Sequence, residues 1–377
     1  MVTEALPFGA LGIVGLRGCE ELIAKVDAYL RHWDVADGGT GRTFVVHASC
    51  PRFATGEGKG LFEQSVRGYD LYVLADMFNY GVTFNMYNLT IPMSPDNHFM
   101  DLKRIISATN GKARRITVIM PMLYEGRQHR RTARESLDCA VVLQELCAMG
   151  VENIITFDAH DPRVQNSIPL KGFENVQPYY QMVKALLARE PGFVIDPEKV
   201  IVVSPDEGAM TRNIFYASVL GLNLGMYYKR RDYTTVVKGR SPIVSHEFLG
   251  ESVEGKDVII ADDMISTGES ILGISEDLKD RGARRIFIFA TFGLFTDGLE
   301  VFHRAYERGV FERVFTTNLV YRPPSLQSCE WYSEVDMSKY IAYLVSTLNY
   351  DRSISGLLDP VTRIKEILPP RTAALDD

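Results

Sequence analysis

The segment 258–270, which reads VIIADDMISTGES, combines residue types that could bind a sugar phosphate. An apolar run ends in two carboxylates, and a turn rich in Ser, Thr and Gly follows. Such a turn at the start of a helix presents free backbone N–H groups and the positive end of the helix dipole, and both attract phosphate. Asp262 and Asp263 stand where paired acceptors could hold the hydroxyls of a ribose. Further hydroxyl donors could come from Ser266, Thr267 and Ser270.

This turn also has a simpler explanation, because Ser, Thr and Gly are common where a helix is merely capped. The two adjacent acids favour a binding site over a cap. A carboxylate at the end of a buried strand loses contact with water, and a partner must compensate for that loss. We therefore interpret 258–270 as a ligand-binding loop.

Two short clusters of cations could meet the phosphates of a second ligand. Arg127 and Arg130 belong to RQHRR, and each could make forked hydrogen bonds to phosphate oxygens. Lys229 and Arg231 lie on a polar segment after an apolar run, which suits a closing lid. Either cluster, taken alone, could equally be a solvated surface. The chain as a whole has a formal net charge of -7, which argues against a broad nucleic-acid surface and leaves anion binding to such local clusters.

Strands and helices alternate along the chain, and this pattern places the polar segments. Alternation predicts parallel sheets built from β-α-β units, in which ligands bind beyond the carboxyl ends of the strands. Amphipathic helices are expected at 132–149 and 269–282. Strands are expected at 116–121, 153–160, 200–206, 257–263 and 284–293.

The length of 377 residues predicts about two domains, and a hydrophobic content of 46% is enough for two cores. The stretch 161–198 is rich in Pro and has no core strand, so the junction is placed near its start. The predicted division is an N-terminal extension at 1–40, domains at 41–170 and 171–335, and a helical tail at 336–377. The tail segment 338–360, whose first half has helical periodicity, is expected to pack on the N-terminal domain.

The composition and the pattern of residues also argue against several classes of protein. No uninterrupted apolar run approaches 20 residues, so no membrane-spanning helix is expected. The N-terminus begins with an acidic rather than a basic region, which argues against a signal peptide. The 5 cysteines are scattered without a C-x-x-C pair, as expected for free thiols in a reducing cytosol. We therefore expect a cytoplasmic protein with no nucleic-acid or membrane partner.

The segment 258–270 resembles the phosphoribosyl diphosphate loop of the type I phosphoribosyltransferase family. The usual form of that loop is an apolar strand followed by Asp-Asp-Met-Ile-Asp-Thr-Gly-Gly-Thr. In this chain Ser266 stands where the family has Asp, and Glu269 stands where it has Gly. The resemblance implies a ribose-phosphate site formed by Asp262, Asp263, Ser266, Thr267, Gly268, Glu269 and Ser270.

Five further segments narrow the resemblance to one branch of that family, the ribose-phosphate diphosphokinases. The motifs follow the order of the family from about residue 45 to 295, and together they are far more specific than any one alone. They are PRFATGE with EQSVRG (51–57 and 63–68), YEGRQHRR (124–131), TFDAHDPRVQNSI (156–168), VVSPDEGAMTR (202–212) and YYKRRDY (227–233).

This resemblance implies an α/β fold with two tandem phosphoribosyltransferase-like domains, each a mainly parallel sheet flanked by helices. It also implies homodimers that build hexamers, in which Phe53 and Glu57 contact the adenine of ATP across a subunit boundary. Lys229 and Arg231 would be catalytic, and His160 and Asp206 would help to hold Mg²⁺. The full ATP-binding set would be Phe53, Glu57, Arg127, Gln128, Arg130 and His160.

The implied reaction is the magnesium-dependent transfer of the β,γ-diphosphoryl group of ATP to the anomeric hydroxyl of ribose 5-phosphate. Its products are phosphoribosyl diphosphate and AMP. Three alternatives remain open: the same chemistry on a related acceptor such as ADP-ribose, a catalytically silent regulatory paralogue, and a transferase that consumes the diphosphate. Glu269 bears on the first alternative, because a carboxylate facing the phosphate would repel it. We expect Glu269 to face away, at the start of the following helix, where the dipole favours a carboxylate.

Overall fold

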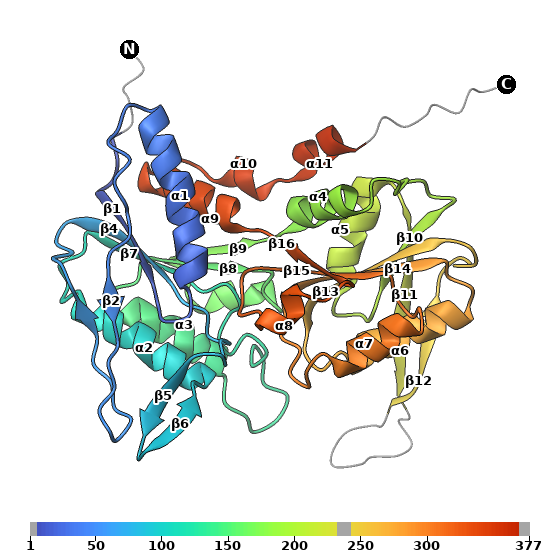
Figure 1. Ribbon diagram of the computed structural model, residues 1–377, viewed down its shortest axis with the longest axis horizontal. Helices are drawn as coiled ribbons and strands as arrows, with labels where there is room; N and C mark the ends of the chain where they lie inside the picture. Colours follow the sequence, from blue (N-terminus) through green and yellow to red (C-terminus); the bar gives the residue numbers. More distant parts are fainter. Residues whose placement is uncertain (1–5, 232–242, 369–377) are drawn as a thin grey trace. The chain divides into compact units, whose positions relative to one another are not determined.

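The computed structural model describes residues 6–231 and 243–368, with side chains described for 6–228 and 247–368. The chain forms two compact units, which are coloured along the sequence in Figure 1. Unit 1 comprises Met1–Pro178, Thr317–Pro323 and Asp336–Leu358. Unit 2 comprises Tyr179–Thr316, Pro324–Val335 and Asp359–Asp377.

Unit 1 is built on a five-stranded sheet whose strands all pair in parallel and lie in chain order. Helices α2 and α3 pack on one face through a shared apolar core, and α1 and α9 lie on the opposite face (Figure 1). The strands are β1 (Ala10–Gly15), β4 (Tyr69–Leu74), β7 (Arg115–Ile119), β8 (Asn153–Phe157) and β9 (Gly172–Val176). The helices are α1 (Glu20–Ala36), α2 (Pro95–Ala108), α3 (Asp138–Ala148) and α9 (Ser338–Asn349).

Local sequence explains where these helices form. In α1, Leu22, Val26 and Leu30 recur every four residues and are buried, which is the pattern of an amphipathic helix. In α2, the Ser94 side chain accepts a hydrogen bond from the Asn97 backbone N–H, and Pro occupies the first turn. Smaller elements of unit 1 are β2 (Ala48–Ser49), β3 (Leu61–Phe62), the antiparallel pair β5 (Thr83–Met86) and β6 (Leu89–Pro92), η1 (Pro162–Ser167) and α10 (Ser355–Leu358).

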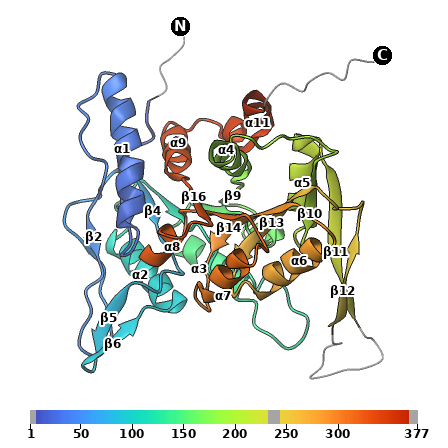
Figure 2. The ribbon, with the colours of Figure 1, turned by 45° about the vertical axis from the view of Figure 1, so that its right-hand side comes forward.

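Unit 2 contains a seven-stranded sheet in the order β12-β11-β10-β13-β14-β15-β16. The neighbouring strands β11, β10, β13, β14 and β15 pair in parallel, whereas β12 pairs antiparallel with β11. Figure 2 shows α4 and α11 on one face and α6 and α7 on the other. The strands are β10 (Val200–Ser204), β11 (Asn223–Arg231), β12 (Ile243–Leu249), β13 (Asp257–Ile265), β14 (Arg285–Gly293), β15 (Arg313–Thr317) and β16 (Tyr332–Val335). The helices are α4 (Tyr179–Arg189), α5 (Met210–Leu220), α6 (Glu269–Asp280), α7 (Glu300–Glu307), α8 (Pro324–Gln327) and α11 (Val361–Ile367).

The strand order of unit 2 has a reversal point between β10 and β13. The chain passes from β10 outward to β11 and β12, and then returns to the other side of β10 as β13. In open parallel sheets, ligands bind in the crevice beyond the carboxyl ends of the strands at such a point. The segments that follow β10 and β13 are therefore where a site is expected.

The structure confirms the predicted fold class, and the expected strands correspond to β7, β8, β10, β13 and β14. The domain boundaries differ from the prediction in three places. The described part of the predicted extension, residues 6–40, belongs to the first unit, because β1 pairs with β4 inside the first sheet. The first unit runs to Pro178, because β9 is its fifth strand. The tail is divided, with Asp336–Leu358 in unit 1 and Asp359–Asp377 in unit 2.

The expected packing of the first half of the tail is found, since Trp33 of α1 stacks on Tyr343 of α9 with ring centroids 4.5 Å apart. The helix expected at 132–149 begins only at Asp138. Within the described ranges, no helix is both long and apolar enough to span a bilayer.

Candidate functional site

The carboxylates predicted to bind ribose lie at the reversal point of the second sheet. Asp262 and Asp263 lie near the end of β13, and Asp206 follows β10. The Oδ1 atom of Asp262 accepts a hydrogen bond of 2.8 Å from the Asp263 backbone N–H. The guanidinium Nη1 of Arg212, on α5, lies 3.7 Å from the same oxygen. Sequence analysis had not assigned Arg212 to the site, although it ends the quoted 202–212 motif.

This group concentrates negative charge. Burial, followed by repulsion from Asp263, raises the pKa of Asp262 to about 8. The charge of Asp206 acts in the same direction, whereas the guanidinium of Arg212 opposes it. The Asp262 side chain nevertheless keeps 30% of its exposure, so a ligand could reach it. Carboxylates that repel one another at an accessible strand end are suited to hydroxyl donors or to a cation.

The loop after β13 leads into α6 through a tight glycine turn. Gly268 has φ +91, and a Cβ atom at this position would lie 2.4 Å from the ring of Phe302. Both facts require glycine. No side chain of Gly268 can cap α6, whereas the Thr267 hydroxyl accepts a hydrogen bond of 3.3 Å from the Glu269 backbone N–H. The remaining first-turn N–H groups are of the kind that bind phosphate.

Glu269 lies on the side of α6 that faces α7. A groove of about 680 Å³ runs along these helices, and Glu269 lines it together with Leu272, Glu276 and Arg308. The Arg308 guanidinium forms an ion pair with Glu276 across this groove. The first residue of α6 thus borders a surface that also carries cations.

His160, one of the sequence-predicted residues of unit 1, belongs to a cluster of polar side chains beyond the ends of β7 and β8. The rings of His129 and His160 have centroids 5.5 Å apart. The Nε2 atom of His129 lies 3.4 Å from Oδ2 of Asp161, and Arg163 binds the same carboxylate at 2.5 Å. Hydrogen bonding to Arg163 lowers the pKa of Asp161 to about 2, and burial lowers the pKa of His129.

Sequence analysis did not assign His129 or Asp161 to a site. Their contact joins residues 32 positions apart on two loops, so no local pattern in the sequence indicated it. The buried Nδ1 atom of His129 has no hydrogen-bond partner among the described residues. The ring is therefore anchored through its Nε2 atom.

The other predicted nucleotide residues are accessible. Phe53 is 55% exposed on a turn closed by a 2.7 Å hydrogen bond from the Phe53 backbone N–H to the Glu57 carbonyl. Arg127 and Arg130 are exposed. Lys229 and Arg231 end β11, but their side chains and residues 232–242, where the expected lid would continue, lie outside the described residues.

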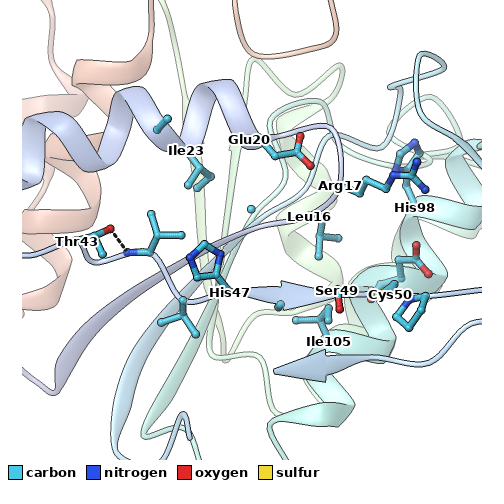
Figure 3. A pocket seen from close by; sticks show the side chains of 17 residues that line it. Leu16, Arg17, Glu20, Ile23, Thr43, His47, Ser49, Cys50, His98 and Ile105 are labelled. Atoms are coloured by element: carbon cyan, nitrogen blue, oxygen red, sulfur yellow. Dashed lines mark hydrogen bonds between the residues drawn. The ribbon is translucent and has the colours of Figure 1, made fainter. Parts of the chain in front are cut away.

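A separate cavity of about 690 Å³ lies in unit 1 and is shown in Figure 3. It lies between α1, the segment 43–51 and α2, with Leu16, Ile23 and Ile105 among its apolar walls. Arg17, His47 and His98 provide polar groups. None of the predicted site residues lines it.

The comparisons with known proteins cover both units. Residues 11–150 match the N-terminal domain of ribose phosphate pyrophosphokinase, and residues 173–328 match the phosphoribosyl transferase domain. A ribose-phosphate pyrophosphokinase from Thermotoga maritima is 32% identical over 279 residues, which cover 72% of this chain and 78% of that protein. One from Vibrio cholerae is 27% identical over 318 residues, which cover 83% and 91%.

A solved structure extends the likeness to the fold. The phosphoribosylpyrophosphate synthetase from Mycobacterium smegmatis matches with a TM-score of 0.72 at 22% identity, over 90% of this chain and 99% of that one. The sequence motifs, the two structural units and the similar proteins all indicate the same family. The chain belongs to the ribose-phosphate pyrophosphokinase family, for which ribose-phosphate diphosphokinase is the alternative name.

Proposed function

We propose that this protein transfers the β,γ-diphosphoryl group of ATP to the anomeric hydroxyl of ribose 5-phosphate. The observation that carries the proposal is the Asp262–Asp263 pair beside the glycine turn of α6, at the reversal point of the second sheet. In the reaction, the anomeric hydroxyl loses its proton to solvent, and its oxygen forms a bond to the β-phosphorus. The bond between that phosphorus and the oxygen bridging to the α-phosphorus breaks, and AMP leaves with the bridging oxygen.

On the sugar side, Asp262 and Asp263 accept hydrogen bonds from the ribose hydroxyls. Such charge-assisted bonds are stronger than neutral ones. The backbone N–H groups of residues 266–270 hold the 5-phosphate, and the hydroxyls of Ser266, Thr267 and Ser270 support them. Together these contacts hold the anomeric hydroxyl in line for attack, which supplies much of the catalysis in a reaction of this type.

On the ATP side, the exposed ring of Phe53 and the carboxylate of Glu57 bind adenine. In the proposed homo-oligomer, dimers build hexamers, and these two residues come from a neighbouring subunit. Arg127, Gln128 and Arg130 bind the phosphates, and the side chains of Lys229 and Arg231 stabilise the negative charge that spreads in the transition state. The exposure of Phe53, Arg127 and Arg130 supports these assignments.

The family implies Mg²⁺, and the residues present fit it. Mg²⁺ prefers oxygen ligands and keeps several waters, so one or two carboxylates are sufficient. The described residues offer no group of three or more His, Cys, Asp and Glu side chains that could hold a metal unaided. After burial, repulsion from Asp263 and Asp206 also raises the pKa of Asp262, and a cation would relieve that repulsion. Asp206 and His160 would hold Mg²⁺ together with ATP, and the cation would neutralise the transferred phosphates.

Ribose 5-phosphate is preferred to a larger acceptor such as ADP-ribose for one reason. Glu269 is exposed at the start of α6, and it lines the groove along α7 together with Arg304 and Arg308. In that position it need not oppose a 5-phosphate dianion. The presence of His160, Lys229 and Asp262–Asp263 argues against a silent paralogue. We place the protein in the cytoplasm.

The test is an assay of purified protein with Mg²⁺, ATP and ribose 5-phosphate, in which AMP and phosphoribosyl diphosphate are measured together. Equal amounts of both are expected, with no turnover when the metal is chelated. Formation of ADP in place of AMP would refute the diphosphoryl transfer. A parallel reaction with ADP-ribose in place of ribose 5-phosphate shows which of the two is the acceptor, because only the acceptor supports AMP formation.

A further inference from the structure

The strand that carries Asp262 and Asp263 extends beyond its neighbour. The parallel pairing of β10 with β13 ends at Val203 opposite Ile260. On its other side, β13 continues to pair with β14 as far as Ile265. The next residue of β13, Ala261, therefore has no strand partner on the β10 side, and it directly precedes the carboxylate pair.

The side-chain amide of Asn213 takes the place of that missing strand. Its Oδ1 atom accepts a hydrogen bond of 3.2 Å from the Ala261 backbone N–H, and its Nδ2 atom donates one of 2.7 Å to the Ala261 carbonyl. Backbone C=O and N–H groups of a neighbouring strand would make the same two kinds of contact. Asn213 is completely buried, with 0% exposure.

The amide is itself held firmly in place. The Nδ2 atom also donates to the carbonyl of Ala209 at 2.8 Å, so each of its two hydrogens has a backbone acceptor. The hydroxyl of Ser204, at the end of β10, lies 3.3 Å from the same nitrogen. Asn213 thereby ties the end of β10, the first turn of α5 and β13 at one point.

We infer that Asn213 is a positioning residue for ribose 5-phosphate binding. This inference rests on the proposed function, because it assigns Asn213 a role through Asp262 and Asp263. The residue before it, Arg212, lies 3.7 Å from the Asp262 carboxylate. One turn of α5 thus fixes both the backbone that leads into the acid pair and the first of its side chains.

The physical reason is that buried backbone groups must be paired. Removal of the amide takes away one acceptor from the Ala261 N–H and one donor from the Ala261 carbonyl, and the strand end must shift or admit water. Both carboxylates would move with it. A displacement of about 1 Å at a reacting group can cost roughly a hundredfold in rate. Asn213 is buried, so it affects ribose 5-phosphate binding only through the position of Asp262 and Asp263.

The experiment compares Asn213→Ala with Asn318→Ala. Asn318 is a matched control, because it is buried to 2% exposure, donates to Asp336 and Ser338, and accepts from the Met337 N–H within unit 1. KM for ribose 5-phosphate, KM for ATP and kcat are measured for each, and melting temperatures record the loss of stability. Direct calorimetric titration with ribose 5-phosphate, without ATP, provides a readout independent of turnover.

Asn213→Ala is expected to raise KM for ribose 5-phosphate tenfold or more, with KM for ATP within twofold of the parent. Asn318→Ala should lose stability without this selective change. Equal sugar affinity in Asn213→Ala and the parent would overturn the inference. If Asn213→Ala does not fold, Asn213→Ser, which keeps a smaller donor and acceptor, is tested by the same criteria. An inactive parent enzyme would instead refute the proposed function, and the inference with it.

Discussion

Replacement of Asp262 by Asn should stabilise the ligand-free protein at alkaline pH while it weakens ribose 5-phosphate binding. Burial and repulsion from Asp263 raise the pKa of Asp262 to about 8, whereas its ordinary value is 3.8. Between these values the folded state binds a proton that the unfolded state has lost. The free energy of unfolding of the parent protein therefore falls as pH rises from about 4 to about 8. Asn carries no titratable proton and escapes this loss.

The structure sets the size of the effect. One pH unit corresponds to about 1.4 kcal/mol. The full change from 3.8 to about 8 would therefore amount to at most roughly 6 kcal/mol. The Asp262 side chain retains 30% of its exposure, and solvent screens its interactions. We expect about 2 kcal/mol in favour of Asp262→Asn at pH 9, and a difference near zero at pH 4.

The assay is urea denaturation of the ligand-free protein at several pH values between 4 and 9. Asp280→Asn is the matched control, because Asp280 is an exposed carboxylate at the end of α6. Its difference from the parent should show little dependence on pH. A difference between Asp262→Asn and the parent that stays constant across this range would refute the reasoning. A decrease in the stability of the variant relative to the parent at pH 9 would refute it as well.

Three further predictions concern the proposed reaction. Lys229→Ala or Arg231→Ala should lower kcat by an amount equivalent to roughly 3–4 kcal/mol, with little change in ATP affinity, because these charges act in the transition state; unchanged turnover would exclude them. His160→Ala should raise the concentration of Mg²⁺ and ATP needed for half-maximal rate, and an unchanged magnesium titration in a folded variant would leave His160 only a structural role. The double change Ser266→Asp with Glu269→Gly should improve KM for ribose 5-phosphate only modestly. An improvement of a hundredfold or more would mean that the native loop serves another acceptor.

The sequence alone was sufficient to predict local structure wherever the residues that form it are close together in the chain. The run at 258–270 contains its strand, its acids and its glycine turn within 13 residues, so the order of residue types already implies their geometry. Gly268 is an example, since φ +91 at the start of α6 is a local requirement. The alternation of strands and helices could also be predicted, because apolar periodicity indicates which face of an element is buried. The family motifs could be identified because each is a continuous run of residues.

The domain boundaries were harder to predict, because the strands at both edges of the first sheet were not recognised. In β1 the run ALGIVG is interrupted by Gly12, and in β9 the run GFENV contains Glu174 and Asn175, so neither has the continuous apolar pattern of a buried strand. Pairing with β4 and β8 makes them strands. Their hydrogen bonds are made to segments far away in the sequence, and local periodicity does not record such partners.

The same reason explains what the tertiary structure alone decided about the candidate site. The approach of His129 to Asp161 joins two loops that follow different strands. Asn213 reaches Ala261 across 48 positions, only because β10 ends before β13 does. The sequence alone determined which residues could bind a sugar phosphate. Strand pairing decided which backbone groups would otherwise be left unpaired, and so which buried side chain must hold the acid pair in place.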